Sequence, residues 1–257
     1  MKNTLIILIL VIFAGSSCKH SSKNDLSLTV KEYQMKGMPD IDTVWSEQNY
    51  IKAHITLGNI RLSNFFSLPR KNSKKSGLVF SRIISKENLS FLDDPAKSLS
   101  DKAFQIQSLS NFLNELSRMY TDNLRSGQYY YKELTDIYSF ELFVRKKMLE
   151  LADKIMNSRK DEDIRMQSGR TAIINGYTSL ISSLLREQAK SKAFPPGEMK
   201  RLSTEVSRSL AENLQYIDSA GRVEISGQIQ KTIEKSSSFF VKNNYRKVLK
   251  KLNANNL

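Results

Sequence analysis

The chain has 257 residues, of which 40 are Lys or Arg and 26 are Asp or Glu, and its formal net charge is +14. This length can form one substantial domain or two small ones. The single cysteine excludes an intramolecular disulfide, so stability must come from the packed core. The positive charge predicts either a solvated surface that aids solubility or a surface that contacts an anionic partner.

The N-terminus has the parts of a secretory signal. Lys2 supplies the positive charge, and the apolar run at residues 5–14 is too short to span a bilayer. Small residues at 15–17 then precede Cys18. This arrangement resembles the N-terminus of a bacterial lipoprotein, because residues 16–18 match the last three positions of the family's cleavage motif.

The resemblance implies that residues 1–17 are removed and that Cys18 is lipidated, with fatty acyl chains such as palmitate tying the protein to a membrane. An acyl thioether would also account for the lone cysteine, because no free thiol remains. Residues 18–39 are then the lipidated cysteine and a flexible tether. Two alternatives stay open: ordinary secretion with an incidental cysteine, and an uncleaved N-terminal anchor.

The residue after the cysteine helps to predict which membrane holds the protein. In the lipoprotein family an aspartate there retains the protein at the inner membrane, whereas this chain has Lys19. The resemblance therefore favours the outer membrane, facing the periplasm, within the cell envelope. Because an exported protein meets little nucleic acid, we expect anionic glycolipids or an envelope protein as partners, and no nucleic acid.

Residues 40–257 have the apolar spacing of an all-α fold. We expect a helical bundle of about six or seven helices, mostly antiparallel with short connections. The first helix is predicted at 40–67, with Asp40 or Asp42 as its N-cap. A shorter helical segment is predicted at 78–92. Proline and glycine at residues 195–197 make the sharpest break, and a domain seam is placed there if the chain divides.

Two longer helices follow and are expected to form an antiparallel hairpin. Ser100 is the predicted N-cap of the first, and Gly127 its end. Their core-facing stripes are Ile106, Leu109, Leu113, Leu116 and Tyr120 in the first, and Ile137, Phe140, Val144, Met148, Leu151 and Ile155 in the second.

Three further helical segments are predicted. The first spans about 161–192, where Gly169 and Gly176 share a face and predict the close approach of a neighbouring helix. The next carries a stripe from Met199 to Leu214. The last follows Gly221 and runs to about residue 252, with a candidate break at 236–238.

No motif for catalysis or for binding a metal or nucleotide occurs, and we assign no catalytic, metal or cofactor-binding residue and expect no cofactor. His20 and His54 are the two histidines. The acidic groups at 93–94 and 161–163 are interpreted as helix-terminal residues. Three consecutive tyrosines at 129–131 cannot all face one core, so we expect at least one of them to be partly exposed.

The C-terminal segment is the best candidate for an interaction surface. Its apolar stripe is Val241, Tyr245, Val248 and Leu252. Beside this stripe lie the residues that we single out for contact with an anionic surface: Lys242, Arg246, Lys247, Lys250 and Lys251. Such a helix either lies on an anionic membrane or docks on the bundle with a solvated basic back.

These patterns indicate a lipid-anchored helical protein of the bacterial cell envelope with a binding or structural role, and not an enzyme. Two other hypotheses stay open. One is a protective lipoprotein, for immunity or exclusion, that binds an acidic partner. The other is an enzyme that acts on peptidoglycan or lipid without a recognisable motif.

Overall fold

The computed structural model describes residues 37–62, 68–74, 76–125, 130–158, 164–190 and 194–254. Within these ranges the regular structure is eight α-helices and two short 3₁₀ helices, without a strand, which confirms the predicted all-α bundle. In chain order the elements are α3 (Glu47–Leu62), α4 (Gly77–Ile83), η2 (Lys86–Leu92), α5 (Leu99–Arg125), α6 (Tyr131–Ser158), α7 (Ile164–Ala189), α8 (Pro196–Asn213), η3 (Leu214–Tyr216), α9 (Ser219–Lys235) and α10 (Phe239–Ala254).

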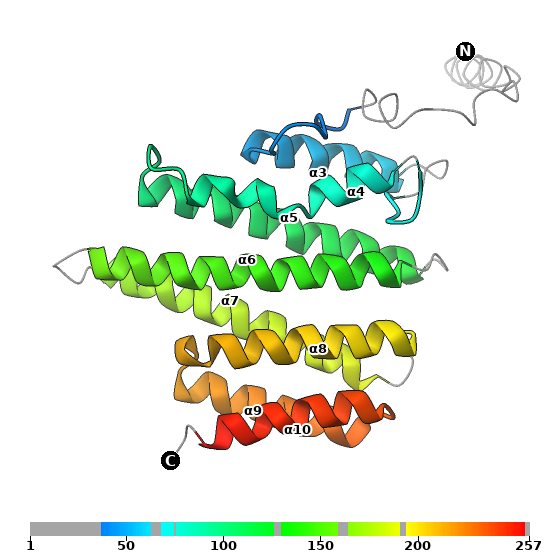
Figure 1. The fold of residues 1–257 in the computed structure, drawn as a ribbon, viewed down its shortest axis with the longest axis vertical. Coiled ribbons are helices and arrows are strands. Elements are labelled where there is room, and N and C mark those ends of the chain that lie inside the picture. The colour runs from blue at the N-terminus through cyan, green and yellow to red at the C-terminus, as the bar shows by residue number, and fades with distance from the viewer. Residues whose placement is uncertain are drawn as a thin grey trace, which may run out of the picture.

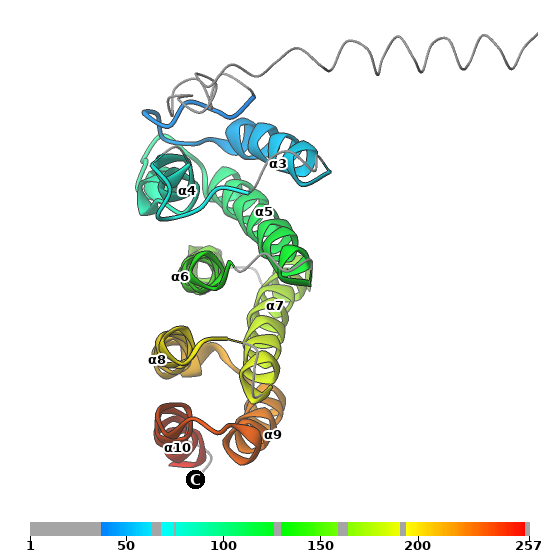
Figure 2. The same ribbon diagram turned by 90° about the vertical axis from the view of Figure 1, so that its right-hand side faces the viewer.

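The helices stack in two layers, so the bundle is elongated along the stacking direction (Figure 1). One layer holds α3, α5, α7 and α9, and the other holds α4, α6, α8 and α10 (Figure 2). Neighbours within a layer pack on each other in the pairs α3–α5, α7–α9, α6–α8 and α8–α10. The antiparallel hairpin predicted in the middle of the chain is α5–α6. One end of the stack is therefore formed by α3 and α4, and the other by α9 and α10 (Figure 2).

Two hydrophobic clusters form the core, and α6 contributes to both. The N-terminal core is built from buried residues between positions 38 and 151 and includes Ile137, Val144 and Met148 of α6. The C-terminal core is built from residues 142–252 and includes Leu142 and Leu149 on another side of α6. This helix therefore joins the two halves of the stack.

The first helix begins at Glu47 and not at Asp40 or Asp42, so the predicted N-cap is wrong. The Asp40 carboxylate accepts a hydrogen bond from the Asp42 amide at 3.0 Å and closes a turn outside the helix. The buried Trp45 then keeps the chain out of the helix at this point, because its amide donates to Asn88 Oδ1 at 3.0 Å. This bond joins residues 43 positions apart, and so a local pattern could not reveal it.

Two other segments differ in detail from their predictions. The segment predicted at 78–92 is divided into α4 and η2, and the Ser85 hydroxyl accepts a hydrogen bond from the Glu87 amide where η2 starts. The N-cap of α5 is Ser98 and not Ser100. Its hydroxyl accepts from the Asp101 amide at 3.1 Å and donates to the Asp101 carboxylate at 2.7 Å. The Ser98 hydroxyl therefore satisfies one of the unpaired amides in the first turn of α5.

The C-terminal third follows its predicted pattern closely. Pro195 precedes the first turn of α8, and residues on both sides of this break contribute to the C-terminal core. The candidate break at 236–238 separates α9 from α10. Helix α9 begins at Ser219, two residues before Gly221, because the Asp218 carboxylate accepts from the Gly221 amide at 2.7 Å. None of the described helices is both long and apolar enough to cross a membrane.

Ile137→Ala tests the N-terminal core. Ile137 is fully buried in α6, so its truncation is expected to lower the free energy of unfolding by about 2–5 kcal/mol through lost burial and the remaining cavity. The measurement is urea unfolding followed by circular dichroism. The control is Val223→Ala at an exposed position, expected to change stability by less than about 0.5 kcal/mol. Equal stabilities of the two variants would contradict this assignment of the core.

Candidate interaction surface

Helix α10 docks on the bundle through its apolar stripe. Val241, Tyr245, Val248 and Leu252 are at most 3% exposed and belong to the C-terminal core. The Tyr245 hydroxyl donates to Gln188 Oε1 of α7 at 2.8 Å, and burial raises the pKa of Tyr245 far above its ordinary value. In this structure the stripe is therefore covered by protein, and only the other side of the helix can meet a partner.

That other side carries the five basic residues singled out from the sequence, which we call the basic face: Lys242, Arg246, Lys247, Lys250 and Lys251. The structure leaves Arg246, Lys247, Lys250 and Lys251 exposed, and Lys242 half-buried. None of the five forms an ion pair with a described residue. Helix α10 contains no acidic residue and ends the stack (Figure 1). Its uncompensated positive charge attracts anionic groups, and a polar outer face also keeps a terminal helix soluble.

An aromatic pair at the start of α10 extends this surface and was not singled out from the sequence. Phe239 is 71% exposed and Phe240 is 51% exposed, with their ring centroids 6.1 Å apart. The Lys200 ammonium of α8 lies 4.3 Å from the centroid of Phe240. Exposed aromatic rings beside cations are typical of contact surfaces. The sequence could have indicated an exposed aromatic ring here, because two adjacent residues of a helix cannot both face one core.

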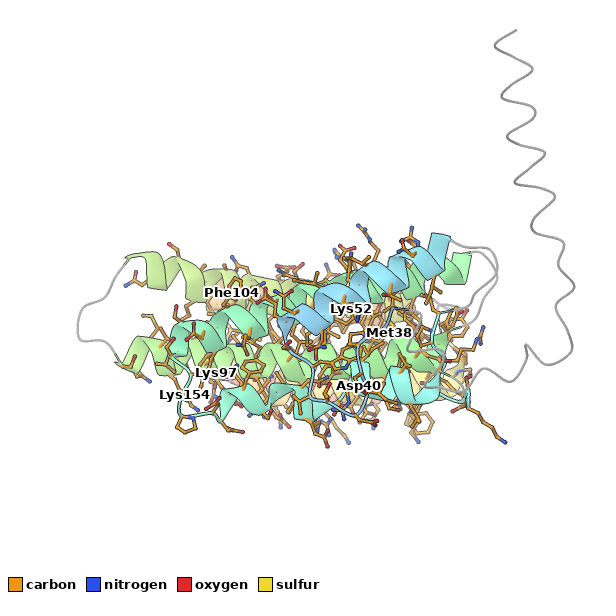
Figure 3. The ribbon with its side chains drawn as sticks, turned by 90° about the horizontal axis from the view of Figure 1, so that it is seen from above. Met38, Asp40, Lys52, Lys97, Phe104 and Lys154 are labelled. Atoms are coloured by element: carbon orange, nitrogen blue, oxygen red, sulfur yellow. The ribbon has the colours of Figure 1, made fainter. Side chains whose placement is uncertain are left out.

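A second candidate surface is an apolar hollow of about 550 Å³ between α5, α6 and α7, which we call the trough. In Figure 3, Phe104 lies on the side of α5 that faces α7, whereas Lys97 and Lys154 lie on the opposite side. Phe104 is 62% exposed. The trough is lined by Ser100, Ala103, Phe104, Ile106, Gln107, Arg145, Met148, Leu151, Ala152, Ile155, Gly169, Ala172 and Ile173.

At the trough, α6 carries a buried acid–base pair. Glu141 is fully buried and Arg145 is only 8% exposed, yet the nearest guanidinium nitrogen lies 3.9 Å from Glu141 Oε1. The Asn114 amide of α5 bridges them when its nitrogen donates to Glu141 Oε1 (2.6 Å) and its oxygen accepts from Arg145 Nη2 (3.2 Å). Burial raises the pKa of Glu141 from 4.5 to about 7, and the Arg145 charge opposes that rise. Burial also lowers the pKa of Arg145.

The two glycines of α7 have different surroundings. A Cβ at Gly176 would lie 2.8 Å from Arg145 Nη1, so this glycine makes room for the guanidinium. The predicted close approach is therefore found at Gly176, although the neighbour is a side chain and not a helix backbone. A Cβ at Gly169 would meet nothing within 4 Å, and this glycine lies open along the trough.

The acidic residues 93–94 and His54 were also considered from the sequence, and the structure places them in a turn and in two hollows. Asp94 accepts from the Ala96 amide in a turn at 2.9 Å, while Asp93 lines a hollow of about 440 Å³ that mixes four lysines with three acids. His54 lines a shallow hollow of about 300 Å³ near Glu47 and Glu115. Across the described residues, no group of three or more His, Cys, Asp or Glu side chains could hold a metal ion.

The tyrosine cluster behaves as expected where it is described. Tyr130 is fully buried, and its ring packs edge-on against Tyr120 at 5.1 Å. Tyr131 is half-buried, and its ring centroid lies 5.5 Å from that of Phe194. Tyr129, Cys18, His20 and the acidic group at 161–163 lie outside the described residues.

Comparison with known proteins returns no match: no family model, no curated protein and no solved structure matches this chain.

The buried Glu141 predicts a pH effect on stability. Its pKa is raised from 4.5 to about 7, so between these values the unfolded chain releases a proton that the folded chain keeps. Stability should therefore fall as the pH rises through this window, by on the order of 3 kcal/mol in total. Glu141→Gln is expected to flatten this part of the profile, as measured by urea unfolding at several pH values.

The control for this prediction is Glu234→Gln, which removes an exposed carboxylate from α9. It should leave the wild-type profile unchanged. If the Glu141→Gln protein loses stability over pH 4.5–7 in parallel with the wild type, burial of this carboxyl does not control the pH dependence.

Proposed function

We propose that this chain is a lipid-anchored helical binding protein of the bacterial cell envelope, held through acyl chains on Cys18. The anchor is supported by the sequence alone: a positive start, a short apolar run and small residues before the only cysteine. Several acyl chains would hold the protein firmly, because each buried methylene contributes about 0.8 kcal/mol and one chain alone binds marginally. Lys19 supports the outer membrane, facing the periplasm, as the location.

A binding role is supported by the arrangement of the helices. A stack of paired helices presents long exposed faces, on which such proteins commonly bind partners. The observation that carries this proposal is the basic face, whose five cations reach the surface without an ion-pair partner among the described residues. Its chemistry suits anionic headgroups, glycolipid phosphates or an acidic envelope protein. We propose binding, not catalysis, as the activity.

Cys18→Ser tests the anchor. Wild-type cells fed an alkyne analogue of palmitate should give a labelled protein whose intact mass lacks residues 1–17 and includes the acyl chains. The variant should lose the label completely, because serine offers no thiol. Ser17→Ala keeps a small residue next to the cysteine and should stay labelled. A wild-type mass that retains residues 1–17, or shows an unmodified thiol, would contradict the anchor.

A second experiment tests the basic face. Full-length protein held in nanodiscs of zwitterionic lipid should capture vesicles that contain anionic lipid, and capture should weaken as salt screens the charges. Replacing Arg246, Lys247, Lys250 and Lys251 by Gln should weaken capture on the order of tenfold.

The control removes the same charge from four lysines of other helices: Lys52, Lys132, Lys231 and Lys235. It should capture vesicles nearly as well as the wild type. Equal losses of vesicle capture in both variants would mean that the net charge of the protein, and not the basic face, drives capture. Unchanged capture by the basic-face variant would mean that α10 does not bind anionic lipid.

A further inference from the structure

The trough between α5, α6 and α7 has the chemistry of a site for an elongated apolar ligand. Its walls are mostly aliphatic, and Arg145 is the only charged residue among those described that line it. Its volume of about 550 Å³ falls within the usual range of small-molecule sites, about 300–1,000 Å³. An open apolar hollow gains free energy when a ligand displaces water from it.

Small side chains from three helices create this space. Ala103 lines it from α5, Ala152 from α6, and Gly169 and Ala172 from α7. Phe104 leaves most of its ring exposed at the same place. Along α6 the lining runs from Arg145 to Ile155, a length of about 15 Å at 1.5 Å per residue. The trough is therefore long enough for an extended chain, with the guanidinium near one end.

Arg145 has hydrogen-bonding capacity that the protein does not use. A guanidinium has five N–H donors. Arg145 Nη2 donates to the Asn114 oxygen at 3.2 Å, but Nε is buried without a hydrogen-bond partner, and the nearest Glu141 oxygen is beyond hydrogen-bond distance at 3.9 Å. Buried donors without acceptors cost free energy. A ligand carboxylate could satisfy them through the two parallel bonds that guanidinium and carboxylate groups form with each other.

From this arrangement we propose that the trough binds a single-chain amphiphile ending in a carboxylate, such as a medium-chain fatty acid. The acyl chain lies along the apolar walls and the carboxylate meets Arg145. A neutral amphiphile offers no charge to the guanidinium of Arg145, whose Nε lacks an acceptor, and a cationic one is repelled. A peptide terminus fits less well, because its backbone N–H and C=O groups would find only Ser100 and Gln107 as uncharged polar side chains among the described lining residues.

Photocrosslinking tests this proposal on the full-length protein in phospholipid nanodiscs. A dodecanoate probe with a photoreactive group on its chain should label peptides that contain residues 100–107, 145–155 or 169–173. Unlabelled dodecanoate should compete at least about tenfold better than dodecanol or dodecyltrimethylammonium, because only the carboxylate pairs with Arg145. Arg145→Gln should abolish this preference.

A pair of glycine variants separates the site from effects on folding. Gly169→Leu fills the trough at a position where an added Cβ meets no neighbour, and it should lower labelling on the order of tenfold. Gly227→Leu makes the same change at an equally open position of α9, away from the trough, and should label like the wild type.

Three outcomes would overturn the proposal. One is labelling that stays at the wild-type level in Gly169→Leu. Another is equal competition by dodecanoate and dodecanol. The third is competition only by an apolar peptide with a free C-terminal carboxylate, which would assign the trough to a protein terminus.

Discussion

The burial of α6 on two sides is the constraint on which the rest of the structure depends. Most helices in a two-layer stack need one apolar face, but α6 contributes Ile137, Val144 and Met148 to one core and Leu142 and Leu149 to the other. Because so much of its circumference is apolar and buried, polar groups on this helix lie close to the interior. Glu141 and Arg145 are the pair that results, and they meet α5 through Asn114 and α7 at Gly176.

The same arrangement accounts for the surfaces that remain open. Both α5 and α7 pack on α6, and where small side chains line all three helices the trough is left between them. Half-buried Asp136 of α6 pairs with Lys71 at 2.7 Å and with Arg201 of α8, which adds contacts between successive elements. The two cations of these pairs reach the solvent, and ion pairs at the surface contribute only about 0–1 kcal/mol each. At the far end of the stack, α10 uses its apolar stripe for docking and leaves its charges outside.

The sequence predicted most of the fold because the helices carry strong apolar periodicity. The stripes of α5 and α10 are buried as their spacing required, as is that of α6 up to Leu151, with Ile155 half-buried, and the break between α9 and α10 fell at the serines before Phe239. One error arose where a partner distant in sequence decides the local structure, whereas the cap of α5 at Ser98 rests on a local bond to Asp101. The start of α3 depends on Asn88 binding the Trp45 amide, and no local pattern contains that bond.

The surfaces differ in how far the sequence could reveal them. The basic face is visible as spaced lysines and arginines in one helix, and the adjacent Phe239 and Phe240 could have been noticed with it. The trough could not be predicted, because Ala103, Ala152 and Gly169 are unremarkable until three helices bring them together. Gly169 was singled out for close packing, whereas the structure leaves its surroundings open.

Hydrogen exchange of the backbone amides, followed by mass spectrometry, tests the central role of α6 most directly. If α6 joins both cores, its amides between residues 134 and 152 should be among the slowest to exchange, and should open only with global unfolding. The amides of α3 and α10 at the ends of the stack should exchange sooner, through local opening. The account would be contradicted if the amides of α6 exchanged as fast as those of α3 or α10. It would also be contradicted if the two halves of the stack unfolded independently while α6 was open.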